Sequence, residues 1–172
     1  MTPKPEHSMR KPILFHDIDG VLFGEYDGEF QLRPGVKTWL KWAHENFEVV
    51  WLTSWEPDKI KILLSVLYVK SHPDHPFRCA NWLTYANKET WLQEAVPKLN
   101  GRAWFWIDDL IERDLASIMR CGLPIERCIQ VNPEGERALE ELRSCLQRQR
   151  EELERLRHGE VAMKSSTWSS AV

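Results

Sequence analysis

The sequence predicts an α/β protein in which a parallel sheet carries helices on both faces and a long helix follows near the C-terminus. Short apolar segments typical of strands alternate with segments of helical periodicity along most of the chain. The first alternation, over residues 13–52, indicates a strand, helix, strand crossover of the kind that joins parallel strands. Asp17, Thr53 and Asp108 each come directly after a predicted strand. Open parallel sheets bind ligands at that edge, so the fold class also predicts where a site lies.

Each expected element follows from a local pattern. The strands are apolar runs rich in β-branched and aromatic residues, and the first helix places Val36, Trp39 and Leu40 on one face. The helix near Pro57 has a favourable first residue, with Ser54 or Glu56 near its cap. In chain order the expected elements are a strand (13–16), a helix (34–42), a strand (47–52), a helix (57–67), a helix (90–96), a strand (103–107), a helix (110–119) and a strand (128–131).

Composition excludes several classes of protein. A chain of 172 residues with 42% apolar and 28% charged residues is expected to form one soluble globular domain. The net charge of -3 gives no overall attraction to nucleic acid or to anionic membranes. Residues 1–11 are polar rather than a signal sequence, and no apolar run approaches the ~20 residues that span a bilayer, so a cytoplasmic protein is expected. The four cysteines have no paired spacing and are expected to be reduced.

Two acidic motifs mark the expected site. Asp17 and Asp19 lie two residues apart after the first strand and can face one point, while Asp108 and Asp109 end a later strand. Carboxylates crowded in this way repel one another unless a cation lies among them, and Mg²⁺ is the first choice. Gly20 lets the backbone turn sharply beside a ligand. The alternative is an Asp-rich turn that binds nothing.

The same residues suggest roles in phosphoryl transfer. Asp17 is a candidate nucleophile that would form an aspartyl phosphate. Asp19 could protonate the leaving oxygen and then deprotonate the hydrolytic water. Thr53 could donate its hydroxyl to a phosphoryl oxygen or, equally, cap the next helix.

The order of these motifs resembles the haloacid dehalogenase (HAD) superfamily of phosphatases and phosphotransferases. Asp17 and Asp19 match the first motif, Thr53 the second and Asp108-Asp109 the fourth, and the resemblance covers residues 12–131. It implies a three-layer Rossmann-like fold, with Asp17 as nucleophile and Mg²⁺ ligand and the backbone carbonyl of Asp19 on the metal. It also implies that Asp108 ligates directly, with Asp109 supporting it through water or ligating in its place.

The third motif of the family is a lysine, which has two candidates here. Lys88 begins a predicted helix before the fourth motif, and Lys98 is its rival. Either charge would neutralise the phosphoryl group and offset the carboxylates.

The resemblance favours the phosphatase branch, because dehalogenases lack an acid at the position of Asp19. Residues 23–32 match the short hairpin flap of this fold, with Asp27-Gly28 as its turn. No segment has room for a large cap domain, so the site should be open to a phosphorylated small molecule or a macromolecular phosphate ester. A nucleic-acid end is weakly indicated by a likeness of residues 32–36 and 50–55 to phosphatase modules of RNA repair proteins.

Other readings stay open. Ser54 and Trp55 are candidate substrate-binding residues at the mouth of the site, although core packing is the favoured interpretation of Trp55. The segment His72-Pro73-Asp74-His75 together with Cys79 could suggest a zinc site, but it offers three ligands without a fourth in a Pro-rich loop, and a surface loop is the better interpretation. A catalytically inactive HAD-like module that binds a phosphorylated ligand or partner is the main functional alternative. A phospho-receiver domain is a further alternative, but its acidic residues would occupy the strands in the reverse order.

The expected organisation is a flexible segment (1–11), a HAD-like catalytic domain (12–146), a helical extension (147–158) and a disordered tail (159–172). The extension has leucines at heptad-like spacing, broken by Gln149, and could form a homodimer through a short coiled coil.

Overall fold

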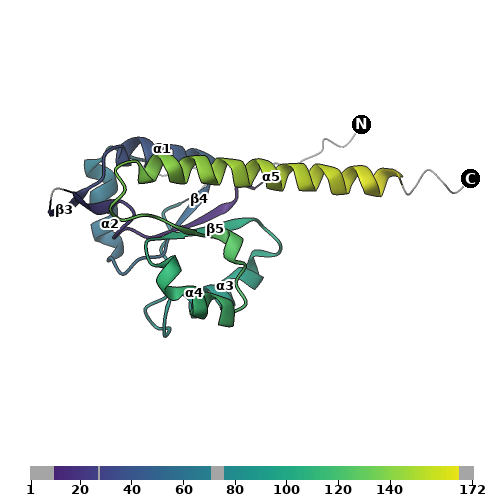
Figure 1. Cartoon of the computed structure of the whole chain (residues 1–172), viewed down its shortest axis with the longest axis horizontal. Coiled ribbons are helices and arrows are strands. Elements are labelled where there is room, and N and C mark those ends of the chain that lie inside the picture. Colours follow the sequence, from purple (N-terminus) through teal and green to yellow (C-terminus); the bar gives the residue numbers. More distant parts are fainter. Residues whose placement is uncertain (1–9, 27, 71–75, 167–172) are drawn as a thin grey trace, which may run out of the picture. The chain divides into compact units, whose positions relative to one another are not determined.

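The computed structural model describes residues 10–26, 28–70 and 76–166, and a four-stranded parallel sheet forms its centre (Figure 1). The strands are β1 (Ile13–His16), β4 (Glu48–Trp51), β5 (Trp104–Asp108) and β6 (Cys128–Gln130), in the order β4-β1-β5-β6. All three pairings are parallel. The prediction of an α/β fold with a parallel sheet is therefore confirmed.

Helices cover both faces of this sheet. They are α1 (Val36–Asn46), α2 (Pro57–Val66), α3 (Lys88–Ala95) and α4 (Ile111–Arg120), with 3-10 turns η1 (Val96–Leu99) and η2 (Ile125–Arg127). Figure 1 shows α1 on one side of the sheet and α3 and α4 on the other. Successive strand residues point to opposite faces, so Phe15 packs in the cluster that contains Leu92 of α3, whereas His16 contacts Trp39 of α1.

The segment after β1 forms the expected hairpin. Strands β2 (Phe23–Tyr26) and β3 (Glu29–Leu32) pair antiparallel as a separate two-stranded sheet. Asp27 lies outside the described residues, and Gly28 takes the left-handed conformation (φ +76°) that a tight turn requires. The hairpin leads directly back into α1, so the insertion between the first strand and the first helix is small.

The start of α3 agrees with the expectation that Lys88 begins a helix and lies two residues before the expected range 90–96. The side chain of Asn87 accepts a hydrogen bond from the Thr90 amide (2.9 Å) and caps the helix, so Lys88 is its first residue. The other capping prediction is partly right, since Glu56 lies at the N-cap of α2, without a side-chain cap. Lys88 therefore lies on a helical turn whose geometry is fixed from Asn87 onward.

The long C-terminal helix α5 (Ala138–Ser166) continues past the predicted end at residue 158. Glu160, Ala162 and Met163 are good helix formers, so Gly159 alone does not stop it and the predicted tail (159–172) is helical to Ser166. The chain divides into the compact units Met1–Leu139 and Glu140–Val172. The division into a catalytic domain (12–146) and a helical extension (147–158) stays a prediction. Dimerisation through α5 stays a prediction.

None of the helices in the described part of the chain combines the length and the apolar character needed to cross a membrane. Residues 1–9, most of the segment predicted to be flexible, lie outside the described residues. Lys11 is fixed, because its carbonyl accepts a hydrogen bond from Arg102 Nε (2.7 Å).

Candidate functional site

Three aspartates meet where β1 and β5 end. The parallel register sets His16 beside Ile107, and the Asp17 amide donates to the Ile107 carbonyl (3.2 Å), which brings Asp17 next to Asp108. One carboxylate oxygen each from Asp17, Asp108 and Asp109 lies within 4.8 Å of the others. Asp17 and Asp108 are buried and Asp109 is half-buried. The predicted convergence is present for Asp17, Asp108 and Asp109, whereas Asp19 does not belong to this group.

Lys88 is the lysine at this site. Its Nζ lies 2.9 Å from Asp17 Oδ2 and 2.7 Å from Asp108 Oδ2, and its side chain is 15% exposed. Burial opposes the charge on Lys88, but Asp17 and Asp108 outweigh it and raise the pKa of the ammonium group. Lys98 lies in η1 and lines a cavity that contains none of these residues. The structure thus brings Lys88, and not Lys98, to the carboxylates.

Asp17 is electrostatically disfavoured in its ionised form. Burial, followed by repulsion from Asp108, raises the pKa of Asp17 from 3.8 to about 7, against the opposing attraction of Lys88. One lysine charge therefore does not balance the acids around it. A divalent cation among the three carboxylates would supply the missing charge, and hard oxygen ligands are those that Mg²⁺ prefers.

Gly20 makes room for the third carboxylate. A Cβ at this position would lie 2.1 Å from Asp109 Cγ, closer than any real contact, and the residue has φ +69°. The Gly20 carbonyl accepts a hydrogen bond from Arg33 Nη2 (2.8 Å), and the same nitrogen donates to the Asn132 carbonyl (2.9 Å). Arg33 therefore fixes the loop in which the acidic motif turns. Because Gly20 has no Cβ, the Asp109 carboxylate can lie against this loop, where it could serve as an oxygen ligand of a cation.

Asp19 occupies a different position from the other acids. Its two carboxylate oxygens each lie 3.1 Å from the indole nitrogen of Trp55, which donates to them. The Trp55 ring packs against Phe23 of the hairpin, with centroids 5.5 Å apart. Trp55 is half-buried, so neither the substrate-stacking nor the core interpretation describes it fully. It links the predicted proton carrier to the hairpin.

Thr53 is buried and lies two residues after the end of β4. The Leu52 amide donates to the His16 carbonyl (2.9 Å), which continues the β1–β4 pairing one residue past Trp51. The Thr53 hydroxyl accepts a weak hydrogen bond from the Trp55 amide (3.4 Å), and α2 begins only after Glu56. Thr53 therefore does not cap that helix. Ser54 is exposed.

Trp82 also borders the site, and apart from the high tryptophan count no sequence pattern pointed to it. Its indole nitrogen donates to the Thr53 carbonyl (2.8 Å), and its ring lies 5.6 Å from Lys88 Nζ. The ring face adds a weak attraction to the lysine charge. The hydrogen bond from the Trp82 indole to the Thr53 carbonyl also fixes the backbone of Thr53.

His16, which points to the α1 side of the sheet, fixes the backbone of Asp17. Trp39 Nε1 donates to His16 Nε2 (2.9 Å), so Nδ1 carries the proton and donates to the Asp17 carbonyl. Burial lowers the pKa of His16 to about 3. The imidazole is neutral at physiological pH. A histidine inside an otherwise apolar strand, directly before the acidic motif, was the available signal.

The substitution His16→Phe is expected to reduce the free energy of unfolding at pH 7 by about 1–3 kcal/mol, because it leaves the Trp39 indole N–H and the Asp17 carbonyl unpaired. Since the folded-state pKa of His16 lies below 6.5, its contribution is present above pH 6.5 and is lost as the pH falls toward 3. The gap between wild type and variant in urea denaturation should therefore shrink between pH 7 and pH 4. A gap that widened on acidification would contradict this role.

The structure does not test the zinc interpretation, because residues 72–75 lie outside the described residues. Cys79 lines a cavity on the α3 side of the sheet.

No protein-family model matches the chain, and a search of curated proteins finds none similar to it. The site must therefore be interpreted from its own residues and geometry.

Proposed function

We propose that the protein is a Mg²⁺-dependent phosphatase of the haloacid dehalogenase type that forms an aspartyl phosphate on Asp17. The observation that carries the proposal is the placement of Lys88 Nζ between Asp17 and Asp108, with Asp109 close by. A buried nucleophilic carboxylate, a fixed cation and a second set of oxygen ligands are the parts that phosphoryl transfer to an aspartate requires. The four-stranded sheet with its short hairpin is compatible with a three-layer Rossmann-like core without a large cap.

The metal would be held by Asp17, Asp108 and Asp109, with the backbone carbonyl of Asp19 as a further ligand. When bound, Mg²⁺ supplies positive charge to the phosphoryl oxygens and keeps Asp17 ionised. A carboxylate with a pKa of about 7 is only partly ionised at neutral pH. The proposal therefore requires the cation to lower that pKa before Asp17 can act as a nucleophile.

The first chemical step would be attack of an Asp17 carboxylate oxygen on phosphorus. The new bond joins this oxygen to phosphorus, and the bond from phosphorus to the ester oxygen breaks with its electron pair. Asp19 gives a proton to the departing oxygen, which leaves as an alcohol. Lys88 and the Thr53 hydroxyl would stabilise the charge on the phosphoryl oxygens.

The second step would release inorganic phosphate. Asp19, now ionised, removes a proton from a water molecule, which attacks phosphorus and displaces the Asp17 carboxylate. The indole N–H of Trp55 lies equally close to both Asp19 oxygens, so it would hold the position of this carboxylate. The substrate would be a phosphorylated small molecule or a macromolecular phosphate ester.

Hydrolysis of 4-nitrophenyl phosphate with and without Mg²⁺ tests this function. Wild type should turn over only with Mg²⁺. The nitrophenolate group leaves without a proton, so Asp19→Asn should still complete the first step and then stop, because no base activates water. We expect one burst of product per site, a steady rate lower by roughly 10²–10⁴-fold, and a protein mass increased by one phosphoryl group.

Two results would contradict the proposal. The first is equal turnover with and without Mg²⁺. The second is no cleavage of aryl phosphates, sugar phosphates, nucleotides or 3′- and 5′-phosphorylated oligonucleotides by the folded protein. If inorganic phosphate with Mg²⁺ nevertheless raised the unfolding temperature, the inactive binding module would be the better description.

A further inference from the structure

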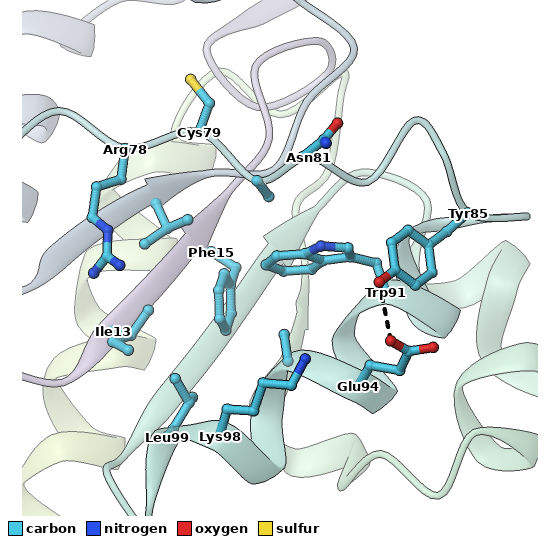
Figure 2. Close-up of a pocket in the computed structure, with 13 residues that line it drawn as sticks. Ile13, Phe15, Arg78, Cys79, Asn81, Tyr85, Trp91, Glu94, Lys98 and Leu99 are labelled. Atoms are coloured by element: carbon cyan, nitrogen blue, oxygen red, sulfur yellow. Dashed lines mark hydrogen bonds between the residues drawn. The ribbon is translucent and has the colours of Figure 1, made fainter.

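A second cavity lies on the α3 side of the sheet, and none of the proposed catalytic residues lines it. Its volume is about 350 Å³, at the lower end of the range of small-molecule sites. Its walls come from strands β1 and β4, the segment around Cys79, and the α3–η1 helix pair. Figure 2 shows its lining residues.

The floor of this cavity is apolar and aromatic. Ile13, Phe15 and Val50 are buried in the sheet and face it. Phe15 and Trp91 meet edge to face with centroids 5.7 Å apart, and Figure 2 shows both rings at the floor. Trp91 is only half-buried, so part of a large aromatic surface stays accessible. Such a floor favours the apolar body of a small organic molecule.

The rim carries two cations, Arg78 and Lys98, and one carboxylate, Glu94. Arg78 is paired with Glu48, and the Tyr85 hydroxyl donates to Glu94 Oε2 (3.0 Å). Lys98 extends along the edge of the cavity in Figure 2, and its ammonium forms no ion pair with any residue in the described ranges. A ligand that combines an apolar body with one negative charge would satisfy both the floor and Lys98.

We propose that this cavity binds a small organic anion with a flat apolar body, such as an aromatic carboxylate. The body lies against Phe15 and Trp91, and the carboxylate pairs with Lys98. The site is separate from the aspartates and does not depend on their activity.

A titration followed by NMR tests the site with two matched probes, 2-naphthoate and its neutral analogue 2-naphthamide. We expect the indole N–H signal of Trp91, assigned with Trp91→Phe, to shift and saturate with a Kd of about 1 mM or tighter for 2-naphthoate. The neutral amide should bind roughly two- to five-fold more weakly, the range expected for one partly exposed ion pair.

Variants test which residues contact the carboxylate of the ligand and which contact its apolar body. Lys98→Met should weaken 2-naphthoate two- to five-fold, to the affinity of the amide, and leave the amide unchanged. Lys59→Met, which removes an exposed lysine on α2, should change neither. Ala95→Leu places a larger side chain in the cavity and should abolish binding of both probes, with circular dichroism confirming that the variant folds.

The proposal is overturned if 2-naphthoate causes no saturable shift at Trp91 in wild type. It is equally overturned if Lys98→Met leaves both affinities unchanged, or if folded Ala95→Leu binds as wild type does.

Discussion

Asp17→Asn is expected to make the metal-free protein more stable at pH 8 than wild type, while it removes the proposed activity. Burial and Asp108 raise the pKa of Asp17 from 3.8 to about 7. Between about pH 4 and pH 7, Asp17 is therefore protonated in the folded state and ionised in the unfolded state. The free energy of unfolding of the wild type falls as the pH rises through that window. The neutral asparagine avoids this penalty, which is on the order of 2–4 kcal/mol for a side chain only 8% exposed.

Urea denaturation with a chelator at pH 4 and pH 8 measures this effect. Wild type and variant should be equally stable at pH 4, where Asp17 is protonated, and should differ most at pH 8. Asp58→Asn, which changes an exposed carboxylate on α2, is the control and should show no such divergence. An Asn variant that was less stable than wild type at pH 8 would show that attraction to Lys88 outweighs burial and Asp108.

Added Mg²⁺ should reverse the order of stability. Wild type gains free energy of unfolding as RT ln(1 + [Mg²⁺]/Kd), whereas the variant has lost one ligand and should gain less. If both proteins gained equally, Asp17 would not contribute to a metal site. This result is independent of turnover, so it tests the metal assignment even when the substrate is unknown.

Lys88→Met is expected to have the second large effect. The variant leaves Asp17 and Asp108 without the ammonium that contacts both, at 2.9 and 2.7 Å. Removing one partner of a buried ion pair typically reduces the free energy of unfolding by about 3–5 kcal/mol. The proposed phosphatase activity should fall by roughly 10²–10³-fold, because a preorganised positive charge toward the phosphoryl group is lost.

Thermal unfolding at pH 8 and hydrolysis of 4-nitrophenyl phosphate measure these two losses. Mg²⁺ should restore part of the stability of Lys88→Met, since the cation supplies charge to the same carboxylates, but it should not restore the rate. Lys61→Met, an exposed lysine paired with Asp58, is the matched control and should retain both properties. Unchanged stability and rate in Lys88→Met would remove Lys88 from the site.

The alternation of elements was predictable because it depends on local periodicity. Buried strands such as β1 and β5 are continuous apolar runs, and the helices that follow them have regular apolar spacing. Parallel topology then brings the ends of β1 and β5 together, so the convergence of Asp17 and Asp108 also followed from the sequence. Errors in the predicted ends of elements arose where a single side chain decides where a helix begins. The Asn87 cap, for example, starts α3 two residues before the expected range 90–96.

The choice between Lys88 and Lys98 could not be made from the sequence. Both lysines lie in the helical stretch after an irregular segment whose path has no periodicity to predict it. In the structure that stretch presents Lys88 to Asp17 and Asp108, and Lys98 to the second cavity. The contacts of Trp82 with Thr53 and Lys88 could not be predicted for the same reason, because Trp82 lies in that irregular segment.

By itself, the sequence determined the α/β class and the edge of the sheet at which the aspartates gather, because the alternation of strands with helices and of side chains along a strand are properties of local pattern. The tertiary structure decided which cation faces them, how His16 and Trp55 hold Asp17 and Asp19, and where Gly20 admits Asp109. These are contacts between segments far apart in the chain, set by packing distances of a few ångströms that no local pattern encodes.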